Sequence, residues 1–164
     1  MRPAIVAVLA LALVAGAPAG ARTQRSSCTK AAANAAVRAS ALPADVRDLT
    51  RQPLAGVDSI ICHDLTGDGR ADMAVTLASG GTAGDVAWAA FARKGAGWRL
   101  AGSNPSGYKL GLLRDRRDLV ETQPVYRKND PNCCPTGGFD HRRFHWNGRA
   151  LVVTRLWHDR NAHS

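Results

Sequence analysis

Short apolar stretches separated by tight-turn sequences fill the chain from Val57 onward. Glycine, asparagine and aspartate favour the backbone conformations of tight turns, and a pair such as Asn147-Gly148 is the strongest short-range signal for a β-hairpin. The pattern therefore predicts an antiparallel β-meander. We expect eight strands, near Val57–His63, Ala71–Leu77, Val86–Arg93, Trp98–Ala101, Lys109–Leu113, Leu119–Tyr126, Phe139–Trp146 and Leu151–Trp157.

An alanine-rich segment, residues 29–40, precedes these strands. Alanine has the highest helix propensity, Thr29 suits the N-cap position, and Pro43 ends the helical pattern. The sequence thus predicts the α+β class, with an N-terminal helix packed on an antiparallel β-meander sheet and stabilised by disulfides.

The first 21 residues have the features of a secretory signal peptide. Arg2 supplies the positive charge, a short apolar run follows it, and Ala19-Gly20-Ala21 offers small residues for cleavage before Arg22. Cleavage after Ala19 is the alternative. Cys28 follows Arg25-Ser26-Ser27, which is not a lipid-attachment sequence, so we expect a secreted or extracytoplasmic protein that does not span the membrane.

The chain that remains after removal of the signal peptide has three expected parts. They are a flexible N-terminus at 22–28, a single α+β domain at 29–159 and a loose C-terminus at 160–164. Without Arg2, the 22 Lys and Arg residues become 21 against 13 acidic residues, a formal charge near +8. Such a charge favours anionic partners, although arginine-rich composition alone also produces it.

Four cysteines, Cys28, Cys62, Cys133 and Cys134, remain after this cleavage. Export makes disulfides the expected state, and four cysteines allow three connectivities. We favour Cys28 with Cys62, which leaves Cys133 and Cys134 as a bridge between neighbours or as free thiols. The crossed pairings stay open, and the absence of paired C-x-x-C elements disfavours zinc.

The segment from Asp64 to Asp72 is the most specific local pattern. Calcium needs hard oxygen ligands on a tightly turning backbone, and Asp64, Asp68 and Asp72 stand at loop positions one, five and nine. Thr66 and the Arg70 carbonyl are further candidate ligands. The segment resembles the calcium loops of EF-hands and FG-GAP repeats, but Thr66 replaces an acidic ligand. The alternative is a hairpin turn in which the aspartates accept backbone hydrogen bonds.

A second unusual pattern is the Cys-Cys-Pro turn at 133–135, which lies between two predicted strands. It could lock a loop, act as a redox switch or form a rigid ligand platform. Together with the export signal, the Asp64 turn and the Ser79-Gly80-Gly81 segment, it resembles small secreted proteins and envelope lipoproteins of actinobacteria, of the LppP/LprE type. That resemblance implies an extracytoplasmic location and a fold, but no activity.

The segment 141–146 contains two histidines and two arginines among aromatic residues. On a strand, His141 and His145 would lie ~13 Å apart, too far to share one metal ion, so we expect them at the surface. Extracytoplasmic location disfavours nucleic acid as the partner of this cluster.

We therefore expect a non-enzymatic secreted or envelope-associated protein that binds an anionic envelope polymer or another envelope protein. The alternative is an envelope hydrolase or a redox-active protein that uses the Cys133/Cys134 turn or the Asp64 to Asp72 loop.

Overall fold

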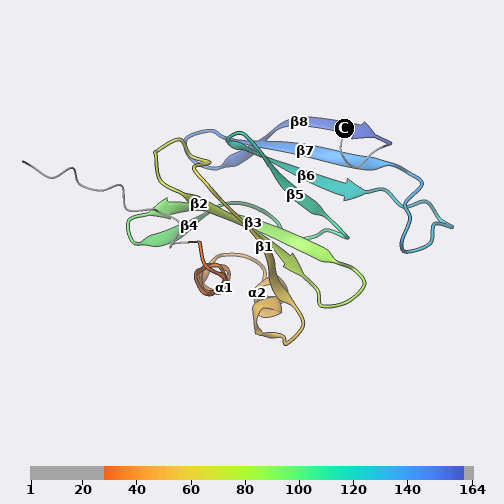
Figure 1. Ribbon diagram of the computed structural model, residues 1–164, viewed down its shortest axis with the longest axis horizontal. Coiled ribbons are helices and arrows are strands. Elements are labelled where there is room, and N and C mark those ends of the chain that lie inside the picture. Colours follow the sequence, from red (N-terminus) through yellow and green to blue (C-terminus); the bar gives the residue numbers. More distant parts are fainter. Residues whose placement is uncertain (1–27, 161–164) are drawn as a thin grey trace, which may run out of the picture.

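The structure is a computed structural model in which residues 28–160 are described. The predicted signal peptide (1–21), residues 22–27 of the predicted flexible N-terminus and residues 161–164 of the predicted loose C-terminus lie outside the described residues. The described chain forms eight strands and a few short helices, arranged in three layers (Figure 1).

The strands form two antiparallel sheets of four strands each, and in both sheets the strand order follows the chain. The first sheet contains β1 (Gly56–His63), β2 (Asp72–Ala78), β3 (Asp85–Lys94) and β4 (Gly97–Asn104). The second contains β5 (Gly111–Asp115), β6 (Asp118–Pro124), β7 (Phe139–Trp146) and β8 (Leu151–Asp159). The antiparallel architecture is as predicted, but the prediction of a single meander sheet is wrong, because the strands form two sheets.

The meander divides between β4 and β5 because the intervening chain hydrogen-bonds elsewhere. Pro105 has no amide hydrogen with which to continue the β4 ladder. The Lys109 amide then donates to the carbonyl of Ala83, in the turn between β2 and β3, and the Leu110 amide donates to the carbonyl of Asp85, the first residue of β3. As a result β5 begins a new sheet instead of pairing with β4.

The two helices lie on the side of the first sheet that faces away from the second sheet (Figure 1). Helix α1 (Lys30–Ala39) begins as predicted, because the Thr29 hydroxyl accepts the amide of Ala32 at 3.1 Å. The sequence analysis missed helix α2 (Ala44–Asp48) and the 3₁₀ turn Leu49–Arg51 that follows it.

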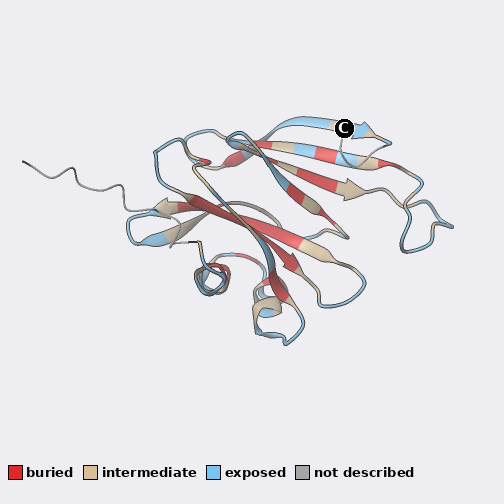
Figure 2. Cartoon of the chain, in the orientation of Figure 1, coloured by how far each residue is buried: buried red, intermediate tan, exposed pale blue. Residues whose placement is uncertain are grey.

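Two apolar clusters form the core. One combines Ala33, Ala36 and Val37 of α1 with side chains of β1, β2 and β3. The other lies between the sheets, where Trp88 packs edge-on against Phe144 with ring centroids 4.9 Å apart. The first six residues of β2 are all buried, since a strand covered on both faces has no solvent side (Figure 2).

A buried carboxylate lies between the sheets. Glu121 of β6 is fully buried and accepts the indole N–H of Trp88 at 2.5 Å. Amide groups of Asn104 and Gln123 donate to the same carboxylate at 3.1 and 2.7 Å. A buried charge is tolerated when donors surround it in this way, so Glu121 fastens the second sheet to the first.

A disulfide joins Cys28, just before α1, to Cys62 near the end of β1. This confirms the favoured pairing. The second disulfide joins Cys133 to Cys134, and the described residues contain no free cysteine.

Candidate functional site

The Asp64 carboxylate caps the turn between β1 and β2. Its two oxygens accept the amides of Gly67, Asp68 and Gly69 at 2.6, 3.1 and 3.0 Å. Gly67 and Gly69 both have positive φ, which lets three successive amides point at one carboxylate. The geometry is that of the hairpin alternative.

The other aspartates of this loop are also engaged. Asp72 is buried and accepts the amides of Leu65, Thr66 and Arg93 at 2.8 to 2.9 Å. Asp68 accepts a hydrogen bond from the Arg70 guanidinium at 2.6 Å. This hydrogen bond holds the pKa of Asp68 below its usual value.

Of the five residues predicted as calcium ligands, Asp64, Thr66, Asp68 and Arg70 lie in the loop between β1 and β2, and Asp72 is the first residue of β2. The carboxylates of the three aspartates already have backbone or arginine partners. Residues 28–160 contain no group of three or more His, Cys, Asp or Glu side chains that could hold a metal ion. These hydrogen bonds favour the hairpin alternative, and calcium binding stays the untested expectation from the sequence.

The loop that carries Cys133 and Cys134 projects from the second sheet between β6 and β7, and both cysteines are exposed. Asp130 fixes its base by accepting the amides of Arg127 and Thr136 and the Thr136 hydroxyl, each at 2.7 Å. The Thr136 and Arg127 amides hold the pKa of Asp130 below its usual value.

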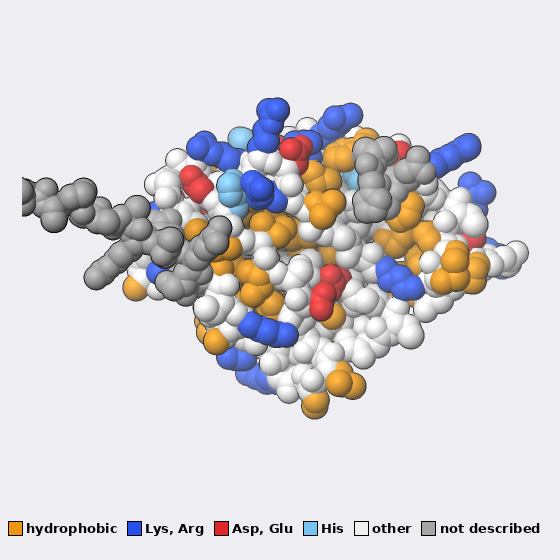
Figure 3. Space-filling model, in the orientation of Figure 1, with side chains coloured by type: hydrophobic (Ala, Val, Ile, Leu, Met, Phe, Trp, Pro, Cys, Tyr) orange, Lys and Arg blue, Asp and Glu red, His pale blue; other side chains and the backbone are white. Residues whose placement is uncertain are grey.

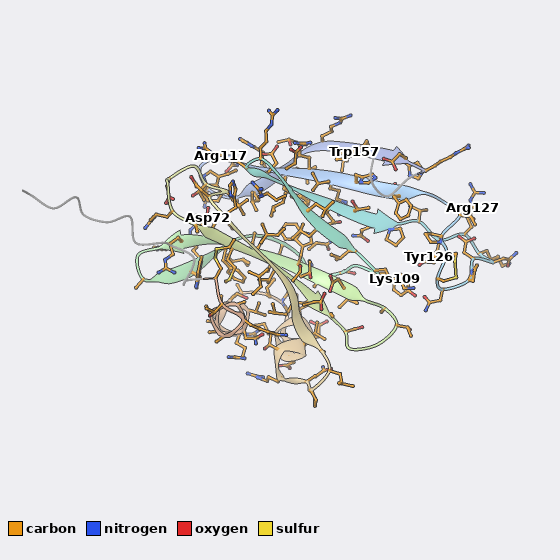
Figure 4. The ribbon with its side chains drawn as sticks, in the orientation of Figure 1. Asp72, Lys109, Arg117, Tyr126, Arg127 and Trp157 are labelled. Carbon is orange, nitrogen blue, oxygen red and sulfur yellow. A yellow bond between two sulfur atoms is a disulfide. The ribbon has the colours of Figure 1, made fainter. Side chains whose placement is uncertain are left out.

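A tyrosine pair, which the sequence analysis missed, supports the same loop. Tyr108 and Tyr126 meet edge-on at 5.4 Å, and the Lys109 ammonium lies 5.6 and 6.0 Å from their ring centres (Figure 4). The Tyr126 hydroxyl donates to the carbonyl of Asn132 at 2.9 Å, and Lys109 donates to the same carbonyl. The sequence analysis could not find this pair because Lys109 has a positive φ. The sequence does not mark that left-handed conformation in a non-glycine residue.

His141 of β7 lies inside a network on the second sheet. Its Nδ1 is 2.9 Å from the Thr122 hydroxyl, and its Nε2 is 3.1 Å from the Asp159 carboxylate. The Trp157 indole stacks on the imidazole with centroids 4.8 Å apart and planes 7° from parallel. His141 is only 2% exposed, so the expectation of a surface position is wrong for His141, whereas His145 is exposed.

A cavity of about 660 Å³ opens beside this network. We call it the Trp157 pocket. Its volume lies in the range of small-ligand sites, and it combines apolar walls with a few polar groups, as such sites do. Its lining residues come from β7 and β8, and they are Asp140, His141, Arg142, Val153, Leu156, Trp157 and His158.

Charged groups in the Trp157 pocket differ in how far they are already paired. His158 lies 2.8 Å from Asp140, which satisfies both side chains. Arg142 is held only loosely, with its Nε 3.8 Å from the Glu121 carboxylate and its side chain half exposed. Arg142 is therefore the cation best placed to meet a ligand.

Apolar side chains in the Trp157 pocket are unusually accessible. Val153 is 48% exposed and Leu156 is 68% exposed, although both lie on a strand. On the face of the molecule seen in Figure 3, patches of hydrophobic surface alternate with lysine and arginine side chains. The described part of the chain offers here an open site with apolar surface and a half-exposed, loosely paired cation.

Comparison with known proteins gives no match. No family model, no curated protein and no solved structure matches this chain. The LppP/LprE resemblance therefore stays a prediction. No helix within residues 28–160 is long and apolar enough to cross a membrane.

Sequence reasoning missed the Trp157 pocket because its residues come from two strands. The hairpin signal at Asn147-Gly148 predicted that β7 and β8 pair. The register that places Trp157 against His141 and Leu156 against Arg142 depends on a bulge at 143/144, which the sequence does not mark.

Proposed function

We propose that this chain is a non-enzymatic binding protein that acts outside the cytoplasm, and that the Trp157 pocket is its binding site. The observation that carries the proposal is the pocket itself: its lining combines Trp157 with the exposed side chains of Val153 and Leu156 and with the half-exposed Arg142. Its ligand is an acidic group with an apolar neighbour.

The histidine network supports binding in preference to catalysis. A general base must reach the proton that it abstracts. His141 is enclosed by Trp157, Thr122 and Asp159, and the second pocket histidine, His158, is already paired with Asp140. Both imidazoles thus have structural partners, and the ligand would meet the exposed Leu156 and Arg142.

Two disulfides support action in an oxidising compartment. The Cys28–Cys62 and Cys133–Cys134 bonds use every cysteine of the chain. Disulfides persist mainly in exported proteins, and the N-terminal sequence has the features of a signal peptide.

A soluble mimic of the ligand tests the proposal. We expect 4-phenylbutyrate to bind the exported protein and to shift the NMR signals of Trp157 and Leu156, with 4-phenylbutanol binding about twofold to fivefold more weakly because it lacks the carboxylate. Arg142→Gln should abolish this difference between acid and alcohol. Arg38→Gln on helix α1 is the matched control and should preserve it. Shifts spread over the whole surface, or an acid preference that survives in Arg142→Gln, would contradict the proposal.

The Cys133–Cys134 bond favours a second candidate function, thiol–disulfide exchange, because both cysteines are exposed. A dithiol protein would transfer two electrons and two protons, break the S–S bond and leave as a disulfide itself. A redox titration against a dithiothreitol buffer tests this, with Cys28–Cys62 as the internal comparison. Reduction of both bonds at the same potential would exclude a dedicated exchange site.

A further inference from the structure

Strand β8 forms one edge of the second sheet. Within the described residues its strand partner is β7, and its nine residues exceed the lengths of the other edge strands, β1 and β4 with eight each and β5 with five. An edge strand presents backbone N–H and C=O groups that can pair with another strand. Figure 2 shows β8 exposed along most of its length.

Apolar side chains accompany this edge on both faces of the sheet. Val153 and Leu156 are the register partners of Phe144 and Arg142, whereas Val152 is the partner of His145 on the opposite face. All three are among the exposed large hydrophobic residues of the described chain. Single exposed apolar residues are ordinary, but three on one free strand mark an interaction surface.

Positive charge surrounds the same edge. The described stretch 149–160 contains Arg149, Arg155 and Arg160 and a single acidic residue, Asp159, which faces His141 at 3.1 Å. The Arg155 guanidinium lies 5.0 Å from the Trp157 ring centre, next to the pocket. An acidic segment would complement the positive charge of this edge. Pairing with a second copy is opposed by repulsion, because the chain as a whole is strongly positive.

We propose that β8 accepts an extended acidic segment of another exported protein as a fifth strand of the second sheet. Backbone hydrogen bonds to the β8 edge would give affinity, and alternate side chains would rest on Val153 and Leu156 or reach the arginines. This inference rests on the proposed function, because the added strand would run past the Trp157 pocket.

Three peptides test the inference on the exported protein. The first is an acetylated seven-residue peptide that alternates glutamate with valine. The second replaces each glutamate with lysine, and the third keeps the acidic sequence but carries N-methyl groups on every second amide, which blocks strand pairing. Affinity is measured by calorimetry, and hydrogen exchange of the backbone amides locates the contact.

We expect the acidic peptide to bind and to slow amide exchange within 151–159. The lysine and N-methylated peptides should each bind at least about tenfold more weakly. Leu156→Gln should weaken the acidic peptide severalfold, whereas Leu54→Gln, at a residue that is 83% exposed and lies outside the second sheet, should not. Both residues are accessible enough for these changes to leave the fold intact.

Equal affinity for the N-methylated peptide would overturn strand addition, as would protection of β1, β4 or β5 in place of β8. Protection of β8 without peptide, together with a dimer in sedimentation, would assign the edge to a second copy and also overturn it. If phenylbutyrate still binds in those cases, the proposed function survives. If phenylbutyrate and the acidic peptide both fail to bind, both proposals are lost.

Discussion

The two disulfides should differ greatly in what they contribute to stability. A disulfide lowers the conformational entropy of the unfolded chain by an amount that grows with the length of the loop it closes. The Cys28–Cys62 bond has a sequence separation of 34, whereas Cys133 and Cys134 are adjacent. For 34 residues the loop-closure expression gives about 3.8 kcal/mol at 25 °C, and for neighbouring residues almost no loop is closed.

Paired alanine variants measure this difference. We expect Cys28→Ala with Cys62→Ala to lower the free energy of unfolding by about 3.8 kcal/mol, which corresponds to a loss of about 14 °C in Tm for a domain of this size. Cys133→Ala with Cys134→Ala should cost less than about 1 kcal/mol. Urea unfolding monitored by tryptophan fluorescence provides the measurement, and the second variant is the matched control for the first.

Equal losses in the two variants would refute the reasoning, because native contacts and not loop closure would then determine the effect. A small loss for the Cys28/Cys62 variant with a steeper urea dependence would show that the oxidised unfolded state is compact.

Three further predictions concern buried and turn carboxylates. Glu121→Gln should lower the free energy of unfolding by about 2 kcal/mol in urea, because the buried indole N–H of Trp88 loses a charged acceptor; an unchanged value would contradict this role. Calorimetry with millimolar calcium should show no heat, since the Asp64 oxygens already accept three amides; heat that disappears in Asp64→Ala would support the calcium prediction. The pKa of Asp130 is lowered in the folded chain, so its hydrogen bonds to Thr136 should contribute above the ordinary carboxyl pKa and be lost as pH falls through the lower folded pKa. The amide shift of Thr136 should follow that titration, and a midpoint at or above the ordinary value would contradict it.

The strands could be predicted from sequence because their signals are local. Each lies between turn sequences, and the structure has a strand at all eight predicted places. The division into two sheets could not be predicted from the sequence. It depends on hydrogen bonds from the Lys109 and Leu110 amides to carbonyls about 25 residues earlier in the chain. Helix α2 has only five residues, too few for a recognisable helical period.

The candidate site was less predictable than the fold. The sequence directed attention to Asp64 and to Cys133, where rare residue combinations stand next to each other. The Trp157 pocket depends on cross-strand register, and the burial of His141 depends on an indole that lies 16 positions later in the chain. Neither feature has a contiguous sequence signature, because each arises only when β7 and β8 pair.

Each sheet pairs only strands that are neighbours in the chain, and this would have a consequence if the chain is exported, as proposed, and emerges from a translocation channel N-terminus first. Residues up to 104 complete the first sheet before any residue of the second is needed. Cys28 and Cys62 would then be the first two thiols to reach the oxidising side, and they could pair correctly while Cys133 and Cys134 are still inside. In that case the order of emergence alone would remove the competing connectivities, so oxidative folding should need little help from a disulfide isomerase.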